Sequence, residues 1–219
     1  MRARIVAAAA RAGRDPASVR LVAVSKTQVP AAVLAAAEAG QGDFGENYLQ
    51  EALPKLDALA SRPLTWHFIG ALQSNKTRVL AERFHWVHTL DRESLARRLS
   101  DQRPASLPPL QVCLQVNVSG ESSKGGVAPD RAAELAAAVA TLPRLTLRGL
   151  MAIPAPAQDQ AAQRAPFRKL RELQDALNAK GFALDTLSMG MTEDMEAAIL
   201  EGSTIVRIGT AIFGRRPPK

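Results

Sequence analysis

The stretch TLSMGMTEDMEAAILEGSTIVRIGT, residues 186–210, predicts a strand, a helix and a second strand in close succession. Its two apolar runs, 186–190 and 204–209, are near-continuous rather than alternating, which favours a parallel sheet that is covered on both faces. The alanine-containing segment 192–201 between them predicts a helix that starts near Thr192. Strands separated by helices in this way indicate an α/β fold.

The same alternation extends along the whole chain. Eight short apolar runs are predicted strands: 21–25, 43–46, 65–70, 86–90, 110–118, 147–153, 186–190 and 204–209. Helical stretches lie near 30–39, 47–60, 75–83, 91–102, 129–142, 159–180 and 192–201, after a first helix that ends near Gly13. Eight alternations without a glycine-rich dinucleotide fingerprint favour a (β/α)8 TIM barrel over a doubly wound sheet. We therefore expect one α/β barrel domain, residues 1–219.

The composition limits the partners that this protein can have. Of its 219 residues 47% are hydrophobic, which is enough for a sizeable core, but no apolar run approaches the ~20 residues of a membrane helix. A net charge of +7 is compatible with a polyanionic partner, yet the basic residues are interleaved with acidic ones along the chain. We therefore expect a cytoplasmic protein that binds a small molecule and contacts neither nucleic acid nor a membrane.

The functional site of such a barrel forms at the carboxyl ends of its strands, where this sequence collects polar residues and glycines. Ser188 and Gly190 precede a predicted helix, and Gly209 and Thr210 follow the eighth predicted strand. The loops after strands 7 and 8 form the usual phosphate site of barrels, because backbone N–H groups and a helix start face the ligand there. These residues predict an anion site; the alternative is that the glycines serve only tight turns.

Lys26 ends the apolar run LVAVSK, residues 21–26, so its amine is expected at the mouth of the barrel. Partial desolvation and a nearby cation such as Arg207 would favour the uncharged amine, which is the nucleophile toward an aldehyde. A lysine and a phosphate site on one face indicate a phosphorylated carbonyl compound as the ligand. Two interpretations stay open: Schiff-base chemistry at Lys26, or a lysine that extends to solvent or binds phosphate as a plain charge.

Beyond these features, the sequence resembles the YggS/PROSC family, the pyridoxal 5′-phosphate homeostasis (PLP-binding) proteins. The matching stretches are LVAVSKTQ, FGENYLQE, WHFIGALQSNK, VNVSGESSKGG, GLMAIP and LSMGMTEDMEAAILEGSTIVRIGTAIFGRR. The resemblance implies a TIM barrel like the N-terminal domain of alanine racemase, with pyridoxal phosphate as its cofactor. It implies that Lys26 carries the cofactor as a Schiff base, that Asn47 lies by the ring and that Arg207 faces the pyridine nitrogen. The phosphate residues that it implies are Ser188, Met189, Gly190, Gly209 and Thr210.

The arginine implied at the ring nitrogen argues against catalysis. Arginine stays protonated and only donates hydrogen bonds, so it does not make the ring a strong electron sink. Racemases of similar fold add a tyrosine base from a separate domain, which is not expected here, and Tyr48 is expected to pack or to hydrogen-bond. We expect a monomeric, non-enzymatic protein that maintains intracellular pyridoxal phosphate and releases it to apo-enzymes. The alternatives are a racemase-like enzyme and, on net charge alone, a nucleic-acid-binding protein.

The remaining titratable side chains have structural interpretations. Glu46 is expected to orient neighbouring groups. His67 lies within an apolar run and is expected to be a hydrogen-bonded core residue. His85 and His88, around the fourth predicted strand, have no partner that the sequence makes visible.

Two further residues stand out, and neither indicates a metal site. Cys113, in LQVCLQVNV, is expected to be a buried apolar residue rather than a nucleophile. Lys124, in ESSKGG, is expected on a loop, where it covers the site, offers a secondary site for the aldehyde or is simply exposed. The histidines and the cysteine have no metal-ligand spacing, so no metal is expected.

Overall fold

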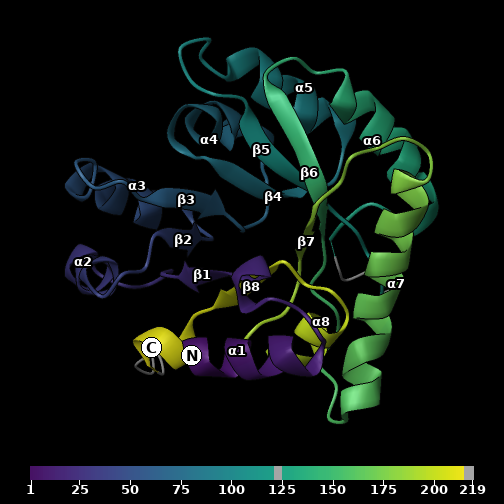
Figure 1. Ribbon diagram of the computed structural model, residues 1–219. Helices are drawn as coiled ribbons and strands as arrows, with labels where there is room; N and C mark the ends of the chain where they lie inside the picture. Colours follow the sequence, from purple (N-terminus) through teal and green to yellow (C-terminus); the bar gives the residue numbers. More distant parts are fainter. Residues whose placement is uncertain (121–124, 215–219) are drawn as a thin grey trace.

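Eight parallel strands close into a barrel in the computed structural model, which describes residues 1–120 and 125–214 (Figure 1). The strands follow one another around the barrel in chain order, and β8 pairs with β1 to close it. They are β1 Arg20–Val24, β2 Asp43–Glu46, β3 Thr65–Phe68, β4 Trp86–Leu90, β5 Leu110–Gln115, β6 Leu145–Met151, β7 Thr186–Ser188 and β8 Ile205–Ile208. The predicted (β/α)8 barrel is confirmed, and each predicted strand is present.

Helices cover the outside of the barrel, and α1 lies beside α8 (Figure 1). The α-helices are α1 Arg2–Arg11, α2 Pro30–Glu38, α3 Leu49–Ala58, α4 Thr77–Arg83, α5 Glu93–Gln102, α6 Ala132–Ala140, α7 Gln160–Asn178, α8 Met195–Leu200 and α9 Thr210–Phe213. Three short 3-10 helices accompany them: η1 Pro16–Ser18, η2 Ser74–Lys76 and η3 Pro129–Arg131. The predicted bounds of these elements differ from the observed ones by a few residues.

The start of α8 is the difference that matters for the site. The sequence predicts a helix from Thr192, but α8 begins only at Met195. The carboxylate of Asp194 accepts a hydrogen bond from the N–H of Met191 at 2.6 Å, which closes a turn before the helix. Residues 191–194 are therefore a loop at the carboxyl end of the barrel.

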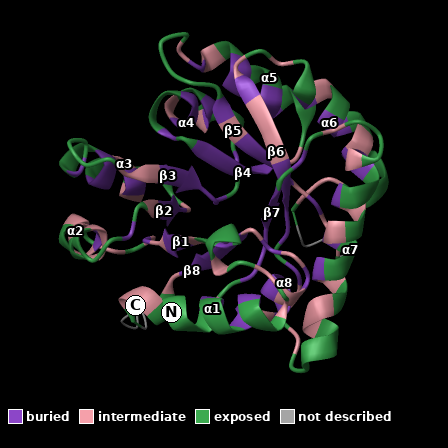
Figure 2. Ribbon diagram, viewed as in Figure 1, coloured by how far each residue is buried: buried purple, intermediate pink, exposed green. Residues whose placement is uncertain are grey.

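Most strand residues are buried, although part of β6 is only half-buried, whereas the helices expose their outer sides (Figure 2). One hydrophobic cluster lies between the strands and the helices. A smaller cluster lies within the barrel and consists of Val22, Trp86, Cys113, Met151 and Ile205. Burial raises the pKa of the Cys113 thiol to about 12, so Cys113 is the buried apolar residue that the sequence predicts.

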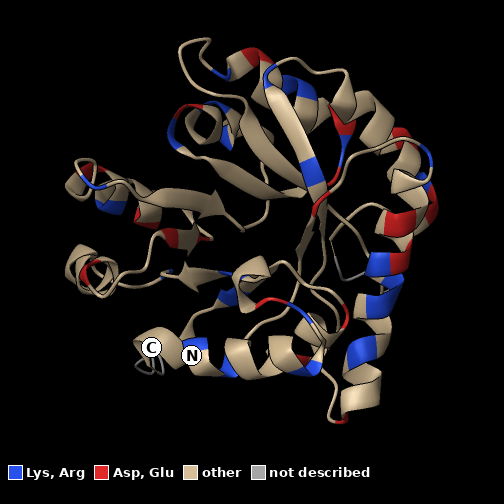
Figure 3. Ribbon diagram, viewed as in Figure 1, with Lys and Arg blue, Asp and Glu red and all other residues tan. Residues whose placement is uncertain are grey.

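Charged residues of both signs are mixed on the outer helices, most visibly along α7 (Figure 3). Arg164, Arg168 and Arg171 of α7 converge on the buried carboxylate of Glu201, at 2.7, 3.1 and 3.5 Å. These arginines therefore join α7 to the end of α8. Within residues 1–120 and 125–214, no helix is both long and apolar enough to cross a membrane.

Candidate ligand-binding site

A cavity of about 430 Å³ opens at the carboxyl ends of the barrel strands. Its wall includes five of the predicted site residues, from the ends of β1, β2 and β8: Lys26, Asn47, Arg207, Gly209 and Thr210. The segment 153–157 after β6 and the loop 191–194 after β7 also line it. The structure therefore brings residues from distant parts of the chain to one cavity, at the end of the barrel that the fold predicts.

Lys26 lies two residues beyond β1, in a turn on the cavity wall. The next residue, Thr27, has a φ of 67°, a left-handed conformation that β-branched residues seldom adopt. The N–H of Thr27 donates to Oε2 of Glu51 on α3 at 2.9 Å, which ties the turn to that helix. The turn fixes where the Lys26 backbone enters the cavity, while the role of its amine stays a prediction.

A buried ion pair lies behind this turn. Lys55 Nζ of α3 is 2.7 Å from Glu46 Oε1 at the end of β2, and the two side chains are 3% and 0% exposed. The Ser25 hydroxyl donates to the same carboxylate oxygen at 2.6 Å, and the Ser25 carbonyl accepts from Lys55 Nζ at 2.7 Å. Burial raises the pKa of Glu46, against the hydrogen bonds from Lys55 and Ser25. Glu46 thus orients its neighbours, as predicted; Lys55 is a partner that the sequence did not indicate.

Asn47 follows β2 directly and brings an amide to the cavity. Its Oδ1 is buried and has no hydrogen-bond partner among the described residues. A buried acceptor without a donor costs about 1–3 kcal/mol, so a ligand that donates a hydrogen bond here would remove that cost. The orphaned oxygen is the strongest single indication that a polar ligand belongs in this cavity.

Arg207 of β8 brings a fixed positive charge to the cavity floor, although its side chain is almost entirely buried. Its Nη1 donates to Ser188 Oγ at 2.7 Å, and its Nη2 donates to the carbonyl oxygen of Ala152 at 3.0 Å. Burial lowers the pKa of the guanidinium to about 10, with Asp194 opposing that shift. The group therefore remains charged at neutral pH and acts only as a donor.

Ser188, Met189 and Gly190 are predicted phosphate residues, but they do not line this cavity. Ser188 is buried and bonded to Arg207, and Met189 belongs to the outer core. Gly190, with a φ of +97°, packs so closely on α8 that an added Cβ would lie 2.6 Å from the Cβ of Ala198. Thr192 of the following loop does line the cavity, and the assignment of Ser188, Met189 and Gly190 to the phosphate stays a prediction.

The structure also tests the histidine predictions. His67 is a buried, hydrogen-bonded core residue, as predicted. His88, for which the sequence shows no partner, is a buried residue inside β4 and bonds to His67 at 2.9 Å and to Ser188 at 2.7 Å. His85 accepts a hydrogen bond from the N–H of Trp66 at 3.0 Å. These partners lie on other strands, so the sequence alone does not show that they are neighbours.

Two other predicted features lie away from the cavity wall or outside the described residues. Tyr48 is 56% exposed and is not among the residues that line the cavity. Lys124 and the basic residues of the tail, 215–219, lie outside the part of the chain that the structure describes. The prediction that the Lys124 loop covers the site therefore stays a prediction.

The fold and the site define a (β/α)8-barrel protein with a small-molecule cavity at the carboxyl ends of its strands. Comparison with known proteins identifies the family to which the chain belongs. The family described as "Alanine racemase, N-terminal domain" matches residues 1–217. A protein of Pseudomonas aeruginosa named pyridoxal phosphate homeostasis protein is 64% identical over 214 residues, which cover 98% of this chain and 92% of that one. The chain belongs to this family of pyridoxal phosphate homeostasis proteins, which confirms the resemblance seen in the sequence.

Other comparisons agree. The Escherichia coli protein of the same name is 54% identical over 219 residues, covering 99% of this chain and 94% of that one. The structure of PipY from Synechococcus elongatus with PLP bound has a TM-score of 0.84 and 36% identity, covering 98% of this chain and all of that one. Alanine racemase of Corynebacterium glutamicum shares the fold alone, with a TM-score of 0.73 and 16% identity over 99% of this chain and 61% of that one.

Proposed function

We propose that this chain binds pyridoxal phosphate through Lys26, keeps its reactive aldehyde out of solution and releases it to enzymes that need it. The observation that supports this most directly is the single cavity shared by Lys26, Asn47 and Arg207 beside the start of α9. The names of the relatives, and the PLP bound to the similar protein PipY, point to the same ligand. The family match over residues 1–217 supports one domain for the whole activity.

The residues of the cavity fit the chemical groups of pyridoxal phosphate. The cofactor supplies an aldehyde, which condenses with an amine to form a C=N bond and release one water molecule. Lys26 presents an amine on the cavity wall, and the orphaned Oδ1 of Asn47 is an acceptor for a ring hydroxyl. Arg207 offers a donor to a ring nitrogen, which is an acceptor only while it is unprotonated.

The phosphate has its own set of donors on the other side of the cavity. Helix α9 begins at Thr210, and the first N–H groups of a helix have no partner within it. The hydroxyl groups of Thr192 and Thr210 belong to residues on the same wall. We therefore assign the phosphate to Thr192, Gly209 and Thr210, and give Ser188 the task of holding Arg207.

The same geometry supports a carrier rather than an enzyme. Arg207 keeps its proton at neutral pH, so it leaves the ring nitrogen unprotonated and the ring a weak electron sink. Racemisation also needs a proton donor on the opposite face of the ring. Tyr48, the one tyrosine of the sequence, is exposed and away from the cavity wall. We therefore propose that the chain has no substantial turnover of amino acids.

The test compares the wild-type protein with Lys26→Ala and with Lys169→Ala, a control on the exposed face of α7. With pyridoxal phosphate, the wild type and the control should show a new visible absorbance band that Lys26→Ala lacks. Reduction with borohydride should leave the cofactor mass on the peptide that contains Lys26. If the wild-type protein shows no such band, the proposed function is wrong; a band retained in Lys26→Ala would reassign the amine.

The carrier and enzyme hypotheses are separated by two assays on the loaded protein. Incubation with a panel of L- and D-amino acids should give no racemisation or aminotransfer above that of free pyridoxal phosphate. Mixing with an apo-enzyme that uses pyridoxal phosphate should restore its activity. Racemisation well above the free cofactor would instead support a racemase-like enzyme.

A further inference from the structure

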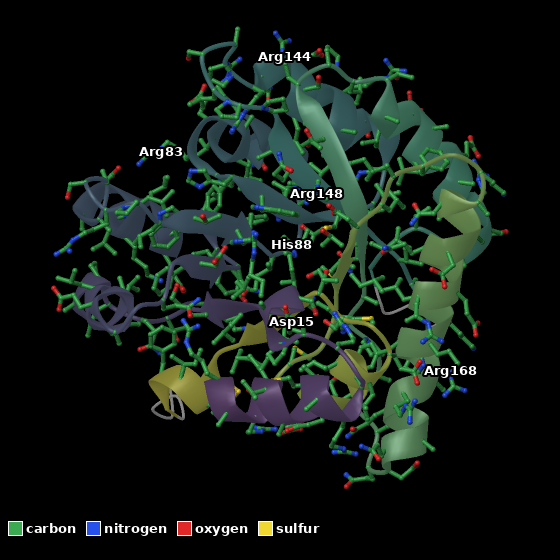
Figure 4. The ribbon with its side chains drawn as sticks, in the orientation of Figure 1. Asp15, Arg83, His88, Arg144, Arg148 and Arg168 are labelled. Carbon is green, nitrogen blue, oxygen red and sulfur yellow. The ribbon has the colours of Figure 1, made fainter. Side chains whose placement is uncertain are left out.

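A row of five polar side chains runs through the barrel interior and ends at the ligand cavity. Asp43 Oδ1 lies 3.0 Å from His67 Nε2, and His67 Nδ1 lies 2.9 Å from His88 Nε2. His88 Nδ1 lies 2.7 Å from Ser188 Oγ, which in turn accepts from Arg207 Nη1 at 2.7 Å. The row draws on β2, β3, β4, β7 and β8, and His88 lies near the centre of the molecule (Figure 4).

Asp43 sets the direction of every hydrogen bond in this row. An ionised carboxylate only accepts, so His67 must donate to it from Nε2. A neutral imidazole that donates from Nε2 accepts at Nδ1, so His88 in turn donates from its own Nε2. The Nδ1 atom of His88 then accepts the Ser188 hydroxyl proton, which leaves the Ser188 oxygen to accept from Arg207. The row therefore has one polarity, from the guanidinium to the carboxylate.

Both imidazoles are neutral at pH 7, as this pattern requires. Burial lowers the pKa of His67, against the opposing effect of Asp43. Burial lowers the pKa of His88 well below its usual value, and His67, Arg207 and Arg20 lower it further. Each neutral imidazole has one N–H donor and one nitrogen acceptor, and the row uses both of them in each ring.

Packing holds the two rings in place. The His67 ring stacks on Trp86 at 5.5 Å between centroids and 17° between planes, and it meets the edge of His88 at 5.1 Å. Trp86 is itself covered by the guanidinium groups of Arg20 and Arg148, at 5.8 and 5.3 Å from its ring. Arg148 is labelled beside His88 in Figure 4. Neither imidazole has room to rotate without disturbing this stack.

The lower end of the row lies at a different opening of the barrel. Asp43 is 24% exposed, has Arg20 at 3.6 Å and lines a second cavity of about 430 Å³ that Arg20 shares. The carboxylate is therefore open to solvent, whereas the two histidines are fully buried. An anion at one end of the barrel and a ligand-facing cation at the other are joined by neutral, directional groups.

We propose that Asp43, His67, His88 and Ser188 are positioning residues that fix the donor pattern of Arg207 at the ligand cavity. Nη1 donates to Ser188 and Nη2 to the Ala152 carbonyl, which leaves Nε–H and one N–H on each Nη as donors of a residue that lines the ligand cavity. The identity of that ligand rests on the proposed function, but the row and its polarity are properties of the free protein. A second-layer carboxylate that fixes a histidine tautomer acts in the same way in catalytic triads.

Asp43→Asn is the informative substitution, because it keeps the shape but removes the charge that sets the direction. The amide can donate to His67 Nε2, which allows both rings to take the Nδ1–H tautomer. His88 would then donate to Ser188, and the Ser188 proton would lose its acceptor. Asp185→Asn is the matched control. Asp185 directly precedes a strand, and it pairs with Arg148, which contacts Trp86 but no member of the row.

The first measurement is nitrogen NMR of the free, full-length protein at pH 7.5. In the wild type and in Asp185→Asn, both His67 and His88 should be neutral with protonated Nε2, and Arg207 should give resolved Nη signals. In Asp43→Asn a fraction of both rings should show protonated Nδ1, and the Arg207 signals should broaden. Identical tautomers and Arg207 signals in Asp43→Asn, or a charged imidazole in the wild type, would overturn the proposal.

The second measurement is titration with pyridoxal phosphate. Asp43→Asn should bind about tenfold more weakly, the scale on which an outer hydrogen-bond partner matters, and its absorbance maximum should move, while Asp185→Asn should match the wild type. Unchanged affinity and spectrum in Asp43→Asn would contradict the proposal even with an intact Schiff base. If Asp43→Asn does not fold, Ser188→Ala breaks the row at its upper end and must disturb the same Arg207 signals. If the wild-type protein does not bind pyridoxal phosphate, the proposed function is wrong. The NMR experiment on the free protein would still test the donor pattern of the row.

Discussion

A Cβ atom at Gly70 would collide with the carbonyl oxygen of Asn47 and lie 2.7 Å from its carbonyl carbon. Gly70 follows β3 and Asn47 follows β2, so the ends of two neighbouring strands touch there through their backbones. No flexible side chain can move aside to make room, because the contacted atoms are main chain. The position of Asn47 on the cavity wall therefore depends on the absence of a side chain at residue 70.

Gly70→Ala should consequently displace Asn47 and weaken ligand binding as well as the fold. We expect a loss of about 1–3 kcal/mol in the free energy of unfolding, the usual cost of overpacking, together with reduced affinity for pyridoxal phosphate. Gly42→Ala is the control: a Cβ there meets nothing within 4 Å, so its unfolding free energy should change by no more than about 1 kcal/mol. Urea unfolding and cofactor titration measure both effects. Equal results for the two variants would mean that the strand ends adjust freely.

Lys55→Met should be strongly destabilising, because it leaves the Glu46 carboxylate buried without its cation. Removing one partner of a buried ion pair costs about 3–5 kcal/mol, and Glu46 Oε2 already has no hydrogen-bond partner within the described residues. The pKa of Glu46, raised by burial, should rise further, so the variant should regain stability as the pH falls and Glu46 takes up a proton. Urea unfolding at several pH values tests both statements.

Lys169→Met is the matched control for this variant, since Lys169 is exposed on α7. Its free energy of unfolding should stay within about 0.5 kcal/mol of the wild type at every pH. The double variant Glu46→Leu/Lys55→Met, which removes both charges, should be more stable than Lys55→Met alone. A Lys55→Met protein as stable as the control would show that the pair is not buried in solution.

Much of this architecture could be predicted from the sequence because it depends on local pattern. The apolar runs define all eight strands. Lys26, Asn47, Gly209 and Thr210 each follow or end a run, and Arg207 lies near the carboxyl end of one, which places them at the cavity. Chain direction alone then decides which end of each strand carries function. The sequence alone therefore predicts which segments are strands and which end of the barrel carries the site.

The partners of buried polar groups could not be predicted in this way. Lys55 lies in a helical stretch where a lysine is normally solvated, and only the packing of α3 on β2 buries it against Glu46. Asp43 and His67 are 24 residues apart, and His88 and Ser188 are 100 apart. Such pairs depend on strand order and register around the closed barrel, which no local pattern contains. The burial of Ser188 against Arg207 is likewise a tertiary property that the sequence does not show.

Thr27→Asn should stabilise the protein, because asparagine tolerates the left-handed conformation that threonine holds at φ 67°. We expect a gain of less than about 1 kcal/mol, because asparagine keeps the Cβ and recovers only part of the ~1–2 kcal/mol that the left-handed conformation costs. Thr27→Pro should lose more than that, since proline fixes φ near −65° and removes the N–H that Glu51 accepts. Thermal and urea unfolding compare the variants. A loss of stability in Thr27→Asn would show that the threonine side chain itself contributes at this turn.

The buried histidines predict a loss of stability in mild acid. The pKa values of His67 and His88 are lowered in the folded protein, whereas in the unfolded chain they lie near the ordinary 6.5. Above pH 6.5 neither state binds a proton at these sites, so their contribution is fully present. Below it the unfolded chain takes up protons that the folded barrel refuses. Stability should therefore fall by up to about 1.4 kcal/mol per pH unit for each histidine until its folded pKa is reached.

His88→Gln isolates this contribution, because it removes one titrating group while glutamine can still hydrogen-bond. Between pH 6.5 and 5.5 the unfolding free energy should fall less steeply than in the wild type, by roughly 1 kcal/mol per pH unit, because the histidine of the unfolded chain is only half protonated at pH 6.5. Other titrating groups, including Glu46 and Asp194 with their raised pKa values, are present in both proteins and cancel in the difference. Equal slopes would mean that His88 is protonated inside the barrel, which is incompatible with the donor pattern that ends at Arg207.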